Sequence, residues 1–91
     1  MLPINPSVAA EMIGKSLEMK CTKIKTNGGI GGKLTESGYE VNISPRKVNK
    51  YKMENGIAGE IFENDLLMVK ILEFKHDPDK DYFVAEIESV I

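Results

Sequence analysis

Residues 63–91 read ENDLLMVKILEFKHDPDKDYFVAEIESVI and hold two apolar runs, residues 66–74 and 82–91. Both runs favour β-branched and aromatic residues, and the polar break at residues 76–81 contains an Asp-Pro pair and other turn-forming residues. This arrangement predicts a β-hairpin. Since the first run has apolar side chains on both faces, we expect it in the middle of a sheet, or against a helix or a partner.

The first run of the hairpin also fits a helix, because Asn64 or Asp65 is a suitable N-cap. We favour a strand because the alternation is clear along both runs. In the first run, one face would carry Leu66, Met68, Leu72 and Phe74, and the other Leu67, Val69 and Ile71. In the second run, one face would carry Phe83, Ala85, Ile87 and Ile91, and the other Glu86 and Glu88.

Three segments before the hairpin predict further strands. Residues 16–25 and 39–43 alternate apolar and polar side chains, and Pro45 ends the second of them. Residues 57–62 form a short apolar run in which Gly59 marks a bulge or a close packing point. No segment looks like a β-α-β crossover, so we expect antiparallel pairing.

The remaining segments predict one short helix and several connections. Asn5 caps a helix over residues 6–14, with proline at its first position. Residues 27–32 contain four glycines and predict a flexible loop. Residues 46–54 are polar and cationic, and they form either one helical turn or an irregular crossing before a tight Asn-Gly turn.

We therefore expect residues 1–91 to form a single small domain, mainly β, with residues 1–15 as an N-terminal helical arm. A short helix plus about five antiparallel strands over residues 16–91 suits a small barrel of the OB or SH3-like type, or a curled sheet. Because Cys21 is the one cysteine, an internal disulfide is excluded and a reducing compartment is favoured. We see no signal peptide and no transmembrane run, so the expected location is cytoplasmic, including a host cytoplasm or virion if the gene is phage-encoded.

The charges are unevenly distributed along the chain. The net charge is −2, yet residues 20–52 hold eight basic and two acidic residues. Residues 53–91 hold three basic and ten acidic residues. A basic band and acidic strands on one small domain favour head-to-tail contacts between proteins.

The cationic residues are the main candidate binding site for a partner or a nucleic acid. In a small barrel, they would line a groove for single-stranded nucleic acid, with tyrosine rings stacking on bases. A sequence pI of about 5.4 argues against this interpretation and favours a solvated face or a protein-binding patch. The candidate residues are Lys23, Lys25, Arg46, Lys47, Lys50, Tyr51 and Lys52.

No combination of residues predicts catalysis or a cofactor. Cys21 and His76 lie far apart in the chain, and zinc would need more cysteine or histidine ligands. Residues 77–81 resemble the start of a calcium loop, but Tyr82 stands where such a loop needs glycine, so we interpret them as an acidic β-turn. The glycine-rich loop lacks the spacing of a phosphate-binding loop, and we expect a mobile surface loop.

These observations favour a non-enzymatic interaction or assembly module of bacterial or phage origin, acting as a homo-oligomer or as part of a larger complex. The final strand would be a sheet edge open to pairing with another chain. The closing pattern looks like the last two strands of many small barrels, including those of phage tails and nucleic-acid binders. The alternatives are a small nucleic-acid-binding barrel and an inhibitor or regulator that binds a host protein.

Overall fold

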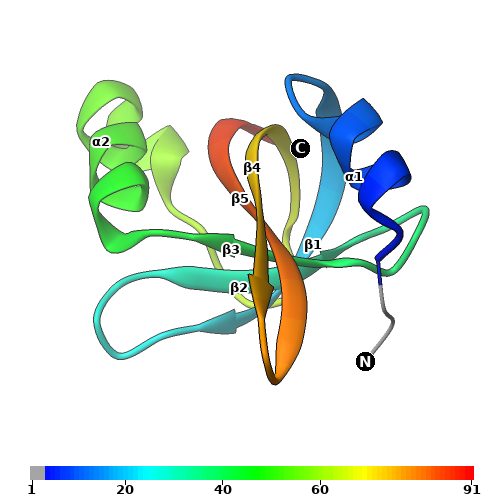
Figure 1. Cartoon of the computed structure of the whole chain (residues 1–91). Coiled ribbons are helices and arrows are strands. Elements are labelled where there is room, and N and C mark those ends of the chain that lie inside the picture. The colour runs from blue at the N-terminus through cyan, green and yellow to red at the C-terminus, as the bar shows by residue number, and fades with distance from the viewer. Residues whose placement is uncertain (1–3) are drawn as a thin grey trace.

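The C-terminal hairpin is the longest pair of strands in the structure, a computed structural model that describes residues 4–91 (Figure 1). Strand β4 (Leu66–Asp77) pairs antiparallel with β5 (Lys80–Val90) along nearly its whole length, and the tight turn lies at Pro78 and Asp79. The predicted hairpin is confirmed, and the helical alternative for residues 66–74 is wrong. Residues 1–3 of the predicted N-terminal arm lie outside the described residues.

Five strands close into a barrel in the order β1-β2-β3-β5-β4, with β4 returning to β1. The predicted fold, mainly β with a small OB- or SH3-like barrel, is confirmed. One pairing departs from the predicted antiparallel sheet, because β3 and β5 run parallel at Val41 and Asn42. The other strands are β1 (Ser16–Ile24), β2 (Ile30–Leu34) and β3 (Glu40–Ile43).

Closure also changes the expected role of the final strand. β5 lies between β3 and β4, so it is not the open sheet edge that we expected from the sequence. The long path from β3 to β5 passes through a helix, a short 3-10 helix and β4. That path is long enough to bring β5 alongside β3 in the same direction, as a parallel pair requires.

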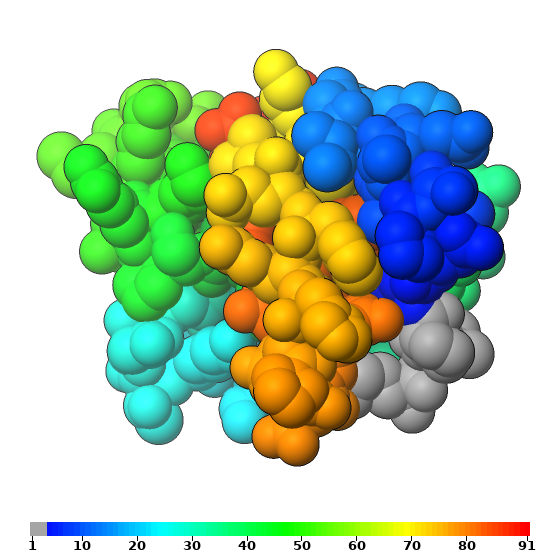
Figure 2. Space-filling model, in the orientation of Figure 1, coloured from blue at the N-terminus to red at the C-terminus, as the bar shows by residue number. Residues whose placement is uncertain are grey.

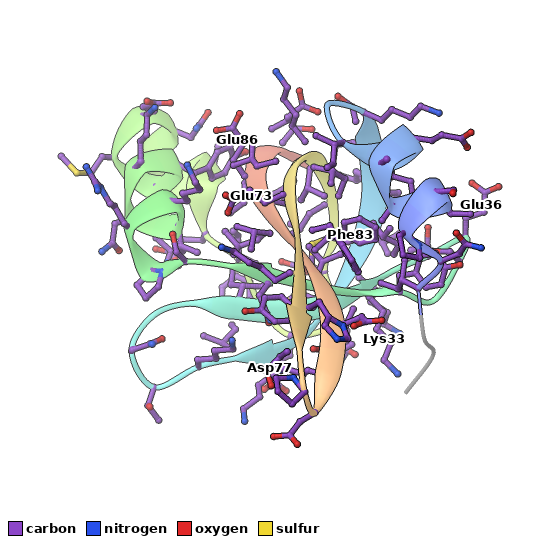
Figure 3. The ribbon with its side chains drawn as sticks, viewed as in Figure 1. Lys33, Glu36, Glu73, Asp77, Phe83 and Glu86 are labelled. Atoms are coloured by element: carbon purple, nitrogen blue, oxygen red, sulfur yellow. The ribbon has the colours of Figure 1, made fainter. Side chains whose placement is uncertain are left out.

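Two bulges in the hairpin decide which of its side chains enter the core. Leu72 is an extra residue in β4, so Phe74 lies opposite Phe83 on the core side instead of facing outward. Glu88 is an extra residue in β5, so Val90 packs against the core while Ile91 is 63% exposed. Phe83 is fully buried inside the barrel (Figure 3).

Strand β2 replaces the flexible loop that we predicted from the glycines. Its backbone must pass very close to β1: a Cβ on Gly32 would lie 2.2 Å from the carbonyl oxygen of Lys20 and 2.4 Å from Cε of Met19. Only glycine fits such an approach. Glycine therefore serves strand packing here, and residues 25–29 alone form the β1–β2 loop.

Two helices lie on opposite sides of the barrel (Figure 1). In α1 (Pro6–Met12), Asn5 caps the helix as predicted, because its side chain accepts from the Ser7 N–H at 2.8 Å. The predicted strand at residues 57–62 is wrong, since η1 (Gly56–Gly59) is a 3-10 helix followed by irregular chain.

Helix α2 (Pro45–Asn55) has three turns, where we predicted one turn or an irregular crossing. The Ser44 hydroxyl caps it by accepting from the Lys47 N–H, and Val48 and Tyr51 bury one face.

Among residues 4–91, no helix is long and apolar enough to cross a membrane.

Candidate interaction surfaces

A cleft of about 320 Å³ lies between α1, the start of β1 and the turn that joins β2 to β3. Its floor is apolar because two residues one helical turn apart on α1 face inward-pointing side chains of the strands. Met12 packs partly against the core, whereas Val8 is exposed at the surface beside the hollow. The apolar lining consists of Val8, Met12, Leu17, Leu34 and Tyr39.

The rim of this cleft is acidic. Glu18 and Glu36 line it, together with Thr35 and Ser37, and none of the basic residues within residues 4–91 does. The turn is held in place because the Thr35 N–H donates to the Glu18 carbonyl oxygen at 3.1 Å. Figure 3 shows Glu36 on the α1 side of the molecule, away from α2. The cleft therefore offers an apolar hollow beside two carboxylates.

The opposite side of the barrel carries exposed apolar side chains beside lysines. Met53 near the end of α2 is 86% exposed, and Ile57 in η1 is 93% exposed. Lys52 lies in the last turn of the helix, and Lys50 lies near its middle, where it lines a small cleft with Glu54 and Glu86. The β4–β5 hairpin crosses the front of the molecule between this side and α1 (Figure 2). We call Met53, Ile57, Lys50 and Lys52 the α2 tip.

The predicted cationic residues fall into two neighbouring groups. Lys23 lies one residue before the end of β1 and Lys25 begins the β1–β2 loop. The other four, Arg46, Lys47, Lys50 and Lys52, lie on α2. The loop packs against the start of the helix, since a Cβ on Gly29 would lie 3.3 Å from Cδ of Pro45. Figure 1 shows the loop and the helix on the same side.

Tyr51 does not share the exposure of these lysines. Only 9% of the residue is exposed, so most of its ring packs in the core and offers little surface for stacking. Lys47 and Lys50 line a small cleft together with Glu54 and Glu86. The cations of α2 are therefore accompanied by carboxylates, unlike Lys23 and Lys25.

Another cleft, of about 230 Å³, lies between the β1–β2 loop, the end of β3 and β5. Lys25, Asn42 and Tyr82 line it, and the Lys25 ammonium donates to the Asn42 side-chain oxygen at 3.2 Å. Asn42 and Tyr82 were missed from the sequence, because their place beside Lys25 depends on the register of β2. Recognition of the glycine-containing segment as strand β2 would have revealed that these two side chains lie beside Lys25.

Cys21 and His76, the cysteine and histidine considered in the sequence analysis, lie in different surroundings. Cys21 is fully buried, and burial raises the pKa of its thiol. His76 is exposed and bonds Asp81, so it does not share a cleft with the cysteine. The Asp77 carboxylate accepts from the Asp79 N–H at 3.1 Å, which fits the predicted acidic turn. Within residues 4–91, no group of three or more His, Cys, Asp or Glu could hold a metal ion.

Comparisons of the chain with protein-family models, with curated proteins and with solved structures give no significant match.

Proposed function

We propose that this chain is a non-enzymatic assembly module whose copies associate head to tail. The acid-rimmed cleft of one copy would receive the α2 tip of the next. The observation that carries this proposal is the complementarity of the two surfaces. One is an apolar hollow beside Glu18 and Glu36, and the other presents Met53 and Ile57 beside Lys50 and Lys52.

The size of the cleft suits a few side chains. About 320 Å³ is near the lower end of the roughly 300–1,000 Å³ typical of ligand pockets. Flexible methionine side chains adapt well to irregular apolar hollows. A whole helix would need a longer groove, so the end of a helix is the better match.

The position of the two surfaces determines the kind of assembly. Because they differ and lie on opposite sides of the barrel, each copy can use both at once (Figure 1). Such a heterologous contact generates a ring if the rotation closes and an open chain if it does not. A symmetric dimer would instead require one surface to meet itself.

The expected affinity is low for a single contact. Burial of Met53 and Ile57 contributes about 3–6 kcal/mol of binding free energy together. Association costs about 4–15 kcal/mol because the two copies lose translational and rotational freedom. The opposite charges add mainly to the association rate and to the choice of partner. Assembly should therefore depend strongly on protein concentration.

Complementary variants test the head-to-tail arrangement by sedimentation velocity across a concentration series. Val8→Lys blocks the cleft with a cation, and Met53→Glu removes the apolar tip; both side chains are exposed, so the fold should remain. We expect each variant alone to be monomeric. An equimolar mixture should give a one-to-one complex and nothing larger, because one functional cleft and one functional tip remain.

Lys70→Glu is the matched control, since this exposed lysine lies on β4 outside both surfaces. It should associate like the wild-type chain. A wild-type chain that stays monomeric at the highest concentration would contradict the proposal, and so would a mixture that fails to form the complex. A monomeric chain that binds another protein through the cleft would favour a regulator instead.

A further inference from the structure

The outer face of β2 has no side chain at Gly31, and neighbouring side chains cover this residue. Gly31 faces outward there, and a Cβ on it would meet only Asn42 Oδ1 at 3.5 Å and Lys25 Cε at 3.7 Å. The Lys25 side chain crosses this position to reach Asn42. The β1–β2 loop and the tip of the β4–β5 hairpin both lie in the lower part of the molecule as drawn in Figure 1.

Lysines gather on this face, although one of them, Lys33, also lies directly opposite Glu40 of β3. Lys20 of β1 lies directly opposite Lys33 of β2, and like charges at such positions repel each other. Lys33 projects from β2 away from the barrel interior (Figure 3). Among residues 4–91, no carboxylate lies within 4.0 Å of the ammonium groups of Lys20, Lys23, Lys25 or Lys33.

The neighbouring cleft adds an aromatic ring and neutral polar groups. Tyr82 of β5 is half-buried and lines the cleft beside Asn42, Val84 and Ser44. The Lys80 ammonium lies 5.3 Å from the centre of the Tyr82 ring, and the same lysine forms an ion pair with Glu40 at 3.1 Å. The nearest carboxylate of β3 is therefore partly neutralised.

We infer that this face binds a single-stranded nucleic acid. Lys20, Lys33 and Lys25 would contact successive phosphates, and one base would stack on Tyr82 within reach of the Asn42 amide. A single strand is favoured over a duplex because a base must be unstacked to enter the cleft. The acidic hairpin tip with Asp77 and Asp79 would keep the phosphates on the β1–β2 side.

This site is separate from the proposed assembly surfaces, and the two can fail independently. Fluorescence anisotropy with labelled oligothymidylate and oligouridylate of about 12 nucleotides measures binding at about 20 mM salt. Three phosphate contacts predict a salt slope of about −2, so affinity should fall about a hundredfold by about 200 mM salt. Comparison of the two oligonucleotides distinguishes DNA from RNA as the preferred strand.

Variants locate the site on the protein. Lys33→Glu should weaken binding and reduce the salt slope, whereas Lys15→Glu, an exposed lysine in the α1–β1 turn, should change neither. Tyr82→Ala should weaken binding at least about fivefold, and Tyr82→Phe should retain it because the ring remains. Met53→Glu, designed to be monomeric, should bind like the wild-type chain.

Several results would overturn the inference. One is the absence of saturable binding at low salt, and another is equal binding to a duplex or to polyglutamate. Equal losses in Lys15→Glu and Lys33→Glu would reduce the interaction to general charge attraction. Loss of binding in Met53→Glu would indicate that the nucleic acid binds at a contact between copies and not in the cleft of a single copy.

Discussion

The ring of Phe74 packs against the ring of Phe83, with centroids 5.6 Å apart and planes inclined by 54°. The two residues lie directly opposite each other on β4 and β5 because Leu72 is an extra residue in β4. Phe83 is fully buried and also meets Tyr39 at 6.2 Å. A single bulge thus decides whether an aromatic side chain joins the barrel core.

Replacement of Phe74 by alanine should therefore cost more stability than replacement of its outward neighbour Leu72. Both side chains are half-buried, but only Phe74 packs on the ring of Phe83. We expect the free energy of unfolding to fall by about 2–3 kcal/mol in Phe74→Ala, somewhat below the range for a fully buried phenylalanine. In Leu72→Ala it should fall by about 1 kcal/mol. Urea denaturation of both variants measures the difference, and equal losses would contradict the assigned register.

Gly32→Ala should destabilise the barrel by about 3 kcal/mol or more, because the added Cβ would meet the Lys20 carbonyl oxygen and the Met19 side chain. Gly31→Ala is the matched control one residue away, where the nearest atom to a Cβ is 3.5 Å distant. That variant should change the free energy of unfolding by less than about 1 kcal/mol. Similar melting temperatures for the two variants would show that β1 and β2 are not so close.

The stability of the fold should decrease in acid through Asp81. The hydrogen bond from His76 lowers the pKa of the Asp81 carboxyl, and the Ile4 N–H at 3.2 Å adds to this effect. Because the folded pKa lies below the unfolded value, the contribution is present above about pH 4 and is lost as pH falls through the folded pKa.

Asp81→Asn should remove that part of the pH dependence. Its free energy of unfolding should change less than that of the wild-type chain between about pH 6 and about pH 3. Asp79→Asn, at the exposed turn, should keep the wild-type profile. Parallel profiles for Asp81→Asn and the wild-type chain would rule out a role of Asp81 in acid sensitivity.

The Cys21 thiol should react with a disulfide reagent only when the barrel opens. The side chain is fully buried, and its raised pKa further lowers the thiolate fraction at neutral pH. Thr22→Cys in a Cys21→Ala background places a thiol at the exposed neighbouring position and should react rapidly. A fast reaction of native Cys21 would contradict its burial.

Side-chain periodicity was sufficient to predict the hairpin and the strands around Met19 and Val41. It failed at β2, where Gly31 and Gly32 provide no apolar–polar alternation although the backbone is fully extended. It also failed at α2, whose buried Val48 and Tyr51 are too few to show a helical stripe among so many lysines. The parallel pairing of β3 and β5 depends on closure of the whole barrel, which local patterns do not encode.

The candidate surfaces were predictable only in part. The lysines were visible, but their grouping depends on which strands pair. The apolar cleft joins Val8 on α1 to Tyr39 beyond β2, and no local pattern connects residues so far apart. Tyr82 was assigned to the hairpin without a role, since its neighbours come from β3 and from the β1–β2 loop.

The parallel contact between β3 and β5 is the shortest seam of the barrel, because only Val41 and Asn42 of β3 pair across it. Transient separation should begin there, and the backbone amides of β3 should exchange with deuterium sooner than those in the middle of β4. Each such opening would uncover two bare strand edges, which are templates for aggregation. A cross-link between β3 and β5 should therefore slow the aggregation of the protein at high concentration.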